Sequence, residues 1–273
     1  MSIQSIALGF MGYAYGTELE MNWIEVTNIT LKLHSLDPAF KGLRLAQISD
    51  FHVGQWMNKK RLDRVIRMAL EEAPDYFILT GDYVERYPHD MSQEESIAAL
   101  SSSFSPLPAF CPTIAILGNH DHRVNAWGVQ QSLSKAGVVV LRNSVMTIRR
   151  GNSELHIAGV DDVREGKARL DNVLRELPQR GAAILLAHEP DFAETSAATR
   201  RFDLQISGHT HGGQIVLPFI GPPLLPELGQ KYPSGLYEVN DMLLYTNRGV
   251  GVTTISARFN CRPEITIFTL EPG

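Results

Sequence analysis

The segment FDLQISGHTH, residues 202–211, changes from apolar to polar within a few residues. Its first part is a short apolar run, as expected for a β-strand buried on both faces of an α/β sheet. Its last part carries His209 and His211, with a glycine on each side of the pair. We therefore predict a buried strand whose carboxyl end presents two histidines at the edge of a sheet.

The same pattern, an apolar strand that ends in polar side chains, occurs four more times along the chain. Open α/β sheets bind their ligands beyond the carboxyl ends of the strands. We therefore expect the polar residues at these five strand ends to lie together. The other four segments are LRLAQISDFH (43–52, ending in Asp50 and His52), DYFILTGD (75–82, ending in Asp82), TIAILGNHD (113–121, with Asn119 and His120) and AAILLAHEP (182–190, with His188).

Helical patterns lie between these strands. Ser92 and Glu95 form a capping-box signature, and Asn125 is a candidate helix start. The alternation of strand and helix predicts a largely parallel sheet with right-handed crossovers. The helices are predicted over residues 59–73, 92–100, 125–137 and 169–177.

Beyond His211 the chain contains strand patterns without a convincing helix, which favours a second, more antiparallel sheet. The segment VLPFIGPPLLPELG, residues 216–229, is apolar and rich in proline, and it follows the histidine pair directly. It either folds back as core or forms an apolar wall beside the site. The predicted strands cover residues 213–219, 235–239, 243–249 and 264–270.

The composition is that of an ordinary globular protein. The 273 residues are 44% hydrophobic and 20% charged, with a formal net charge of −5. An acidic balance argues against a nucleic-acid binder held by phosphate contacts. The two cysteines, Cys111 and Cys261, form neither a disulfide framework nor a thiolate zinc motif.

The N-terminal residues 1–24 begin with an apolar stretch, and residues 1–17 contain no charged side chain. This stretch is shorter than the about 20 apolar residues of a spanning helix. It is either the end of a membrane anchor or a short helix that packs on the body or lies on a membrane surface. We expect residues 25–273 to form a single domain, located in the cytoplasm or peripherally at the inner membrane.

The polar residues at the five strand ends suit a metal centre. Imidazole nitrogens with carboxylate and amide oxygens, and no sulfur, favour borderline divalent ions. These groups outnumber the ligands that one ion needs, whereas two ions that share a carboxylate would use them well. Paired metal ions are a common device for phosphoryl transfer.

Five short motifs then show a family resemblance: DFH (50–52), GD (81–82), GNHD (118–121), HEP (188–190) and GHTH (208–211). Their order resembles that of the calcineurin-like metallophosphoesterases, over residues 43–270. The closing RFNCRPEITIFTL (258–270) is similar to the membrane-associated bacterial branch, which includes phosphodiesterases and UDP-2,3-diacylglucosamine pyrophosphatases. The resemblance implies a four-layer α-β-β-α sandwich of two mixed β-sheets flanked by helices.

The resemblance also implies roles for individual residues. Asp82 would bridge two transition-metal ions (Mn, Fe or Zn), which activate a bridging hydroxide for attack on phosphorus. His120 would bind the phosphate or protonate the leaving group, oriented by Asp121. One ion would be held by Asp50, His52, Asp82 and His211, and the other by Asp82, Asn119, His188 and His209.

Other polar residues allow two interpretations. Arg248 and Arg258 would either bind substrate phosphate or form salt bridges. Asp161 and Asp162 would support the metal ligands or, as we favour, form a turn. The remaining histidines are predicted to be structural or at the surface: His34, His89, His122 and His156.

Three functions fit these observations. The first is a metal-dependent hydrolase of a phosphodiester or pyrophosphate, with a phosphate-ester or nucleotide-lipid substrate and peripheral membrane contact. The second is a phosphomonoesterase or phosphoprotein phosphatase on the same fold. The third, disfavoured by the intact His120, is a metal-stabilised binding scaffold without turnover. No nucleic-acid partner is expected, and the sequence leaves the oligomeric state open.

Overall fold

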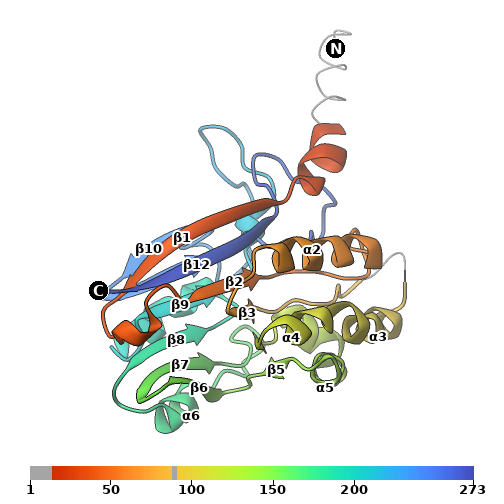
Figure 1. The fold of residues 1–273 in the computed structure, drawn as a ribbon. Helices are drawn as coiled ribbons and strands as arrows, with labels where there is room; N and C mark the ends of the chain where they lie inside the picture. The colour runs from red at the N-terminus through yellow and green to blue at the C-terminus, as the bar shows by residue number, and fades with distance from the viewer. Residues whose placement is uncertain (1–13, 88–90) are drawn as a thin grey trace.

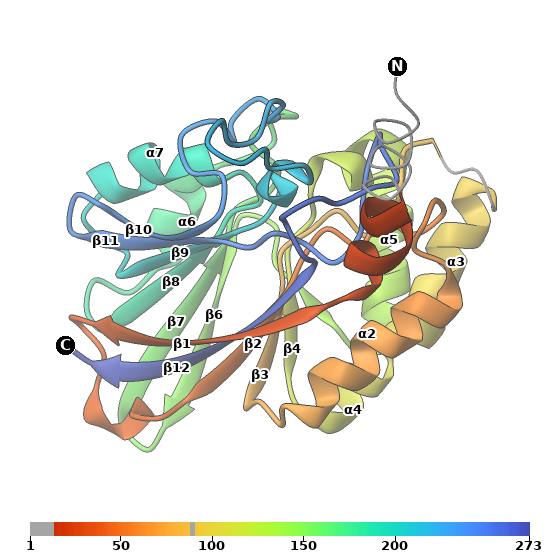
Figure 2. The ribbon, with the colours of Figure 1, turned by 90° about the horizontal axis from the view of Figure 1, so that it is seen from above.

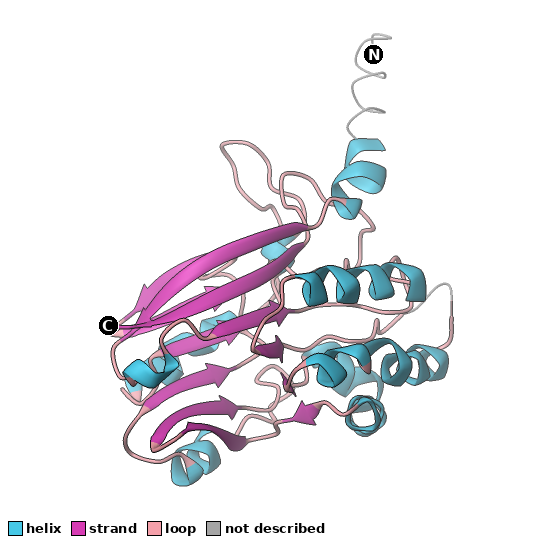
Figure 3. Cartoon of the chain, in the orientation of Figure 1, coloured by secondary structure: helices cyan, strands magenta, loops and turns pink. Residues whose placement is uncertain are grey.

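The structure is a computed structural model that describes residues 14–87 and 91–273. Two six-stranded β-sheets lie face to face, and helices cover the outer face of each sheet (Figures 1 and 3). This arrangement confirms the predicted four-layer α-β-β-α sandwich. The apolar residues 1–13, on which the anchor hypothesis depends, lie outside the described residues.

The first sheet contains both ends of the described chain. Its last strand, β12, is parallel to β1 and antiparallel to β2, and the other pairs are parallel. The strand order is β1 (Glu25–Leu33), β12 (Glu264–Pro272), β2 (Arg44–Ile48), β3 (Tyr76–Leu79), β4 (Thr113–Ala115) and β5 (Val139–Val140).

The second sheet is also mixed. Its three central pairs are parallel, and its two edge pairs are antiparallel. The strand order is β10 (Gly235–Val239), β11 (Met242–Thr246), β9 (Leu204–Ser207), β8 (Ala182–Leu186), β7 (Ser153–Gly159) and β6 (Ser144–Arg150).

The helices separate into two outer layers, which Figure 2 shows from above. Four of them pack on the first sheet: α2 (Lys59–Glu71), α3 (Gln93–Phe104), α4 (Pro106–Phe110) and α5 (Asn119–Ala136). The second sheet is covered by the shorter helices α6 (Leu170–Glu176) and α7 (Ala193–Ala198).

The apolar strands are buried on both faces because each one separates two cores. In β3, Phe77 and Leu79 face the helical core, and Ile78 faces the core between the sheets. In β8, Ile184 lies between the sheets and Leu185 packs toward the second layer of helices. This alternation explains the continuous apolar runs, since a strand with two buried faces needs no polar side.

One prediction about elements is confirmed and one was wrong. α5 is interrupted at Asn125, which has an extended φ of −171°, and the Asn125 side chain accepts a hydrogen bond from the Gly128 N–H, so Asn125 caps the second part of the helix as predicted, whereas the first part, from Asn119, was not predicted. The strands after His211 do not form a separate antiparallel sheet, because β12 joins the first sheet and β10 and β11 extend the second. Residues 213–219 form only isolated bridges.

The N-terminal part of the described chain is a π-helical turn, Tyr15–Leu19, followed by a 3-10 turn, Glu20–Asn22. Its Gly16 carbonyl accepts a hydrogen bond from the Arg258 N–H. Across residues 14–87 and 91–273, no helix has the length and apolar character needed to cross a membrane.

Candidate metal centre

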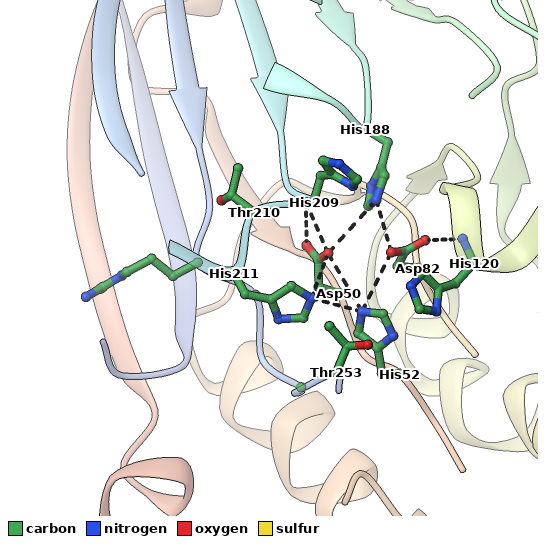
Figure 4. Close-up of polar contacts among 12 residues, drawn as sticks. Asp50, His52, Asp82, His120, His188, His209, Thr210, His211 and Thr253 are labelled. Atoms are coloured by element: carbon green, nitrogen blue, oxygen red, sulfur yellow. Dashed lines mark hydrogen bonds and ion pairs between the residues drawn. The ribbon is translucent and has the colours of Figure 1, made fainter. Parts of the chain in front are cut away.

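The carboxyl ends of β2, β3, β4, β8 and β9 meet at one edge of the two sheets (Figures 1 and 4). All seven side chains predicted as metal ligands lie there, and each is at most 5% exposed: Asp50, His52, Asp82, Asn119, His188, His209 and His211.

The backbone at this edge is strained. Five of the predicted ligands have a left-handed backbone with φ between 49° and 73°: Asp50, His52, Asp82, His209 and His211. This region costs a non-glycine residue of order 1–3 kcal/mol. The strain turns the side chains off the strand direction, so that His209 and His211 both approach Asp50 and its neighbours although they are one residue apart (Figure 4).

Asp50, His52 and His211 form the first cluster of potential ligand atoms. Nε2 of His52 lies 3.0 Å from Nε2 of His211, and Nε2 of His211 lies 3.4 Å from Oδ1 of Asp50. The Asp50 carboxylate also accepts the His209 backbone N–H at 3.0 and 3.1 Å, which fixes the histidine pair against β2. Facing imidazole nitrogens and a carboxylate are a donor set suited to a transition-metal ion.

Asp82, His188 and His209 form the second cluster. Nδ1 of His188 lies 2.6 Å from the Thr80 carbonyl, and Nε2 of His209 lies 2.9 Å from the Glu227 carbonyl. A carbonyl oxygen accepts only from a protonated nitrogen, so each ring keeps its other nitrogen free of a proton when neutral. Such partners orient imidazole for metal binding.

Asp82 stands between the two clusters. Its Oδ2 lies 3.1 Å from Nε2 of His188 and 3.6 Å from Nε2 of His52. Its Oδ1 accepts the backbone N–H of His120 at 2.9 Å. Because Oδ1 is engaged by the backbone, Oδ2 is the Asp82 oxygen that would hold a metal ion.

Asn119 tests whether these residues fit a metal ion. Its side chain is 1% exposed, and among the described residues neither Oδ1 nor Nδ2 has a hydrogen-bond partner. An unsatisfied buried amide costs about 1–3 kcal/mol. A cation that accepts the Oδ1 lone pair would remove much of this cost, so the Asn119 amide fits a metal ion at this edge of the sheets.

Glycines leave room for the carboxylates. A Cβ on Gly118 would overlap the Asp82 carboxylate, and a Cβ on Gly208 would overlap Ser49 Oγ and the Asp50 carboxylate. The backbone that follows β4 and β9 therefore passes closer to the site than any side chain would permit.

The charges of the site influence one another strongly. Burial, followed by the positive charge of His52, holds the pKa of His211 well below its usual value. Burial also lowers the pKa of His52, but Glu85 and Asp82 outweigh it and raise this pKa to about 8. Burial raises the pKa of Asp82, but His188 together with His120 and His52 outweighs it and holds this pKa well below its usual value. Protons therefore compete with metal ions for this site, and metal binding must release them.

His120 lies at the start of α5 beside the first cluster, and its ring centroid is 4.6 Å from that of His52. Its Nδ1 lies 3.4 Å from Oε1 of Glu85, and the other oxygen of Glu85 lies 3.2 Å from Nδ1 of His52. Glu85 is 4% exposed, and the two histidines keep its pKa below the usual range although burial alone would raise it. Sequence reasoning missed Glu85, whose only signal was an acidic side chain three residues after Asp82.

Asp121 does not orient His120, which corrects our prediction. Its carboxylate accepts the backbone N–H groups of Asp82, Tyr83 and Gly118 at 2.8–2.9 Å. Burial and the charge of Asp82 raise its pKa to about 6. Asp121 thus holds the loop that presents Asp82, and Glu85 is the carboxylate that faces His120.

The two arginines proposed as substrate ligands are engaged within the protein, which corrects that prediction. Arg258 is fully buried and donates to the carbonyls of Gly251, Arg248, Gly249 and Cys261. The Arg248 guanidinium pairs with Glu264 and Glu25. Both therefore stabilise the loop after β11, whose Gly251 N–H bonds the Asp50 carbonyl.

Asp161 and Asp162 are buried and support a loop beside the site. Asp161 accepts from His122 at 2.6 Å and from Arg142 at 2.8 Å. Burial, followed by the charge of Glu189, raises the pKa of Asp162 to about 9, so Asp162 holds a proton at neutral pH while Glu189 is ionised.

The other histidines fit the structural or surface interpretation. His122 contacts Asp161, His156 is buried between Thr147 and the Arg180 carbonyl, and His34 is exposed. His89 lies outside the described residues.

A cavity of about 630 Å³ opens onto the metal-ligand clusters. This volume is typical of a small-molecule site. Asp82, Asn119, His120, His209 and His211 contribute to its floor. Its walls include three arginines that sequence reasoning did not single out, together with apolar side chains from the segment after His211: Arg86, Arg123, Arg164, Leu224, Leu225 and Pro226.

Comparison with known proteins agrees with this geometry. Residues 43–213 match the family model described as calcineurin-like phosphoesterase. The chain belongs to the calcineurin-like phosphoesterase family. It is therefore a metal-dependent hydrolase that acts on phosphate esters.

Relatives of this phosphoesterase cover nearly its whole length. An uncharacterized metallophosphoesterase of Bacillus subtilis, YkuE, is 37% identical over 262 residues, which are 95% of this chain and 90% of the relative. Phosphodiesterase YaeI of Escherichia coli is 33% identical over 264 residues, covering 95% of this chain and 93% of the relative. The crystal structure of TT1561 from Thermus thermophilus shares the fold, with a TM-score of 0.51, 12% identity, and coverage of 76% of this chain and 89% of that chain.

Proposed function

We propose that this phosphoesterase uses two metal ions to cleave a phosphodiester or pyrophosphate bond in a lipid-linked substrate. The observation that carries the proposal is the pair of ligand clusters around Asp82, one with Asp50, His52 and His211 and the other with His188 and His209. The orphaned amide of Asn119 adds an uncharged ligand to the second cluster.

The donor set favours manganese, iron or zinc, since it offers imidazole and carboxylate groups without thiolate. When bound, such ions supply Lewis acidity toward the phosphate oxygens and an activated water at neutral pH. The protein's own contribution is the fixed geometry of the ligands, which the left-handed backbone at Asp50 and Asp82 maintains.

His120 has the position of a general acid. It lies on the cavity floor, its side chain is 16% exposed, and Nδ1 faces Glu85. This leaves Nε2 to protonate the leaving oxygen or bind a phosphate oxygen. The Glu85 carboxylate, 3.4 Å from Nδ1, fixes the orientation of the ring.

The arginines of the cavity wall favour a substrate with charge beyond the reacting phosphate. Arg123 pairs with Glu165 at 2.6 Å, whereas Arg164 lies 3.8 Å from Glu227, a weaker and more exposed contact. A diester or pyrophosphate with a second charged group would meet these side chains. We propose that Arg123 and Arg164 bind substrate phosphate, which was one of the two alternatives considered for Arg248 and Arg258.

The apolar wall supports the lipid part of the proposal. Leu224, Leu225 and Ile255 line the cavity beside the polar floor. An acylated nucleotide such as UDP-2,3-diacylglucosamine has both kinds of group, and an enzyme acting on it would work at the inner membrane surface. We assign catalysis to residues 25–273 as one domain, since β1 and β12 pair along their whole length.

Turnover of matched substrates tests this function. The metal-loaded protein should hydrolyse bis(p-nitrophenyl) phosphate faster than p-nitrophenyl phosphate. Faster hydrolysis of the monoester would favour a phosphomonoesterase and contradict the proposal. In a second comparison, UDP-2,3-diacylglucosamine should be cleaved with a kcat/KM at least tenfold above that of UDP-N-acetylglucosamine. Equal values would contradict a lipid-linked substrate without affecting the diesterase assignment.

A further inference from the structure

The loop after the histidine pair exposes an unusual amount of apolar surface. Residues 215–226 contain no polar or charged side chain. Phe219 and Ile220 form the tip of this loop and are 109% and 76% exposed, and Leu224 is 74% exposed. Single exposed apolar residues are normal on a protein surface, whereas a group of this kind indicates a partner.

Two neighbouring segments extend this surface. The loop after β11 exposes Ile255, and the N-terminal turns expose Leu19 and Trp23. Backbone hydrogen bonds join all three segments, from the Val216 N–H to the Phe259 carbonyl and from the Arg258 N–H to the Gly16 carbonyl. Figure 1 shows the N-terminal turns and the two loops projecting at the same end of the molecule.

The loop tip is suited to an apolar environment in its backbone as well as its side chains. The N–H groups of Ile220 and Gly221 both donate to the Leu217 carbonyl, and the Leu217 N–H donates to the Gly221 carbonyl. Pro218 has no N–H to satisfy. Because unsatisfied backbone groups are costly in lipid, this closed turn can enter a bilayer surface at a lower cost than an open loop.

The surface is continuous with the metal site and with charged residues. Leu224 and Ile255 also line the cavity that opens onto the two ligand clusters. The Gln55 side chain donates to Ser256, which joins this surface to the segment before α2, and α2 begins with the exposed residues Lys59 and Lys60. Apolar side chains beside lysines are typical of proteins that lie on a membrane interface.

The chain that precedes these turns has the same character. Residues 1–13, which precede Ala14 in the sequence, contain no charged side chain. An apolar surface of this kind fits a bilayer better than a soluble protein partner, which would need polar groups opposite its own rim.

We propose that this face, formed by residues 15–23, 215–226 and 253–257, docks onto a phospholipid bilayer with Phe219 and Ile220 inserted among the lipids. The cavity mouth then opens toward the membrane, and a lipid-linked phosphate reaches the metal site without leaving the bilayer surface. The inference rests on the proposed function for its substrate, but the docking can be measured independently.

Vesicle sedimentation tests the docking. The full-length, metal-loaded protein is mixed with vesicles of phosphatidylcholine, alone or with 30% phosphatidylglycerol, and the bound fraction is measured against lipid concentration. The wild type should bind both, and more tightly with phosphatidylglycerol. The double variant Phe219→Ser, Ile220→Ser should bind at least tenfold more weakly. Phe110→Ser, which removes a half-exposed phenylalanine from the distant helix α4, should bind like the wild type.

Several results would overturn the proposal. These are equal binding of the wild type and the double variant, a loss of binding in Phe110→Ser as large as in the double variant, and no binding by the wild type. A wild-type dimer that the double variant converts to a monomer, without vesicle binding, would show that the face pairs two copies of the chain. Circular dichroism and the thermal midpoint of each variant establish that it is folded. Diester turnover by the wild type without vesicles reports the proposed function separately, so the two can fail independently.

Discussion

Replacing Glu85 by Gln keeps the size of the side chain and removes the charge that faces two histidines. In the wild type, one oxygen lies 3.4 Å from Nδ1 of His120 and the other lies 3.2 Å from Nδ1 of His52. A carboxylate presents an acceptor oxygen to each ring. An amide accepts from only one and presents an N–H to the other, so one ring must change its tautomer or turn away.

The size of the effect follows from these distances. Two unit charges 3.4 Å apart attract by about 5 kcal/mol at an effective dielectric constant of 20, which is an upper limit for the Glu85–His120 pair. Gln retains part of the hydrogen bonding, and the cavity admits water. We therefore expect kcat to fall by about 10–100-fold, the range typical of residues that orient a functional group. His120→Ala, which removes the acid itself, should cost about 100–10,000-fold.

The assay measures kcat for bis(p-nitrophenyl) phosphate across pH, together with the metal content of each protein. In Glu85→Gln, kcat should be lower than in the wild type across the whole pH range, because His120 loses the carboxylate that orients it. Metal content should remain that of the wild type in His120→Ala. Glu154→Gln, a change on β7 remote from the site, should leave both quantities unchanged.

Two results would refute this reasoning. One is a Glu85→Gln protein with wild-type kcat across the pH range. The other is a Glu85→Gln protein that loses metal but has wild-type turnover per loaded site, which would show that Glu85 acts through His52 alone. Loss of metal in His120→Ala would reassign His120 as a ligand.

Two further changes test the geometry of the site and its surroundings. Gly208→Ala alters no ligand but places a methyl group against the Asp50 carboxylate, so metal affinity should fall at least tenfold. The control Gly151→Ala, in an open turn, should retain its metal. Equal metal contents in the two variants would contradict the packing argument. Burial and the neighbouring Glu189 raise the pKa of Asp162 from 3.8 to about 9, so between these pH values the folded protein holds a proton that the unfolded chain releases. The free energy of unfolding must therefore fall as the pH rises from about 4 to about 9, by up to about 1.4 kcal/mol per pH unit. Asp162→Asn needs no proton, so its thermal midpoint relative to the wild type should increase from pH 5 to pH 9, and parallel curves would contradict the proton on Asp162.

The strand ends were predictable because their signal is local. An apolar run with two buried faces, followed by a polar residue, requires no knowledge of distant pairing, and the ends at Asp50, Asp82 and His188 lie at one edge as expected. Sheet membership was harder. β12 lies between β1 and β2, which precede it by more than 200 residues, and no local pattern encodes that position.

The environment of each polar side chain was the least predictable property. Asp121 follows His120 directly, but neighbouring residues on a helix lie on different faces, so Asp121 points to the Asp82 loop and His120 to the cavity. Glu85 lies after its strand, where only tertiary packing decides that it is buried. Arg258 resembles a substrate ligand in sequence, and its burial under four carbonyls becomes visible only in the folded chain.

The central claim is that two metal ions share Asp82, and metal stoichiometry tests it most directly. After incubation with excess Mn²⁺, Fe²⁺ or Zn²⁺ and removal of free metal, elemental analysis of the wild type should give about two ions per chain, as the number of ligands implies. Asp82→Asn should retain fewer than one, because the change affects both clusters. One ion or none in the wild type, or two ions in Asp82→Asn, would contradict the two-metal centre.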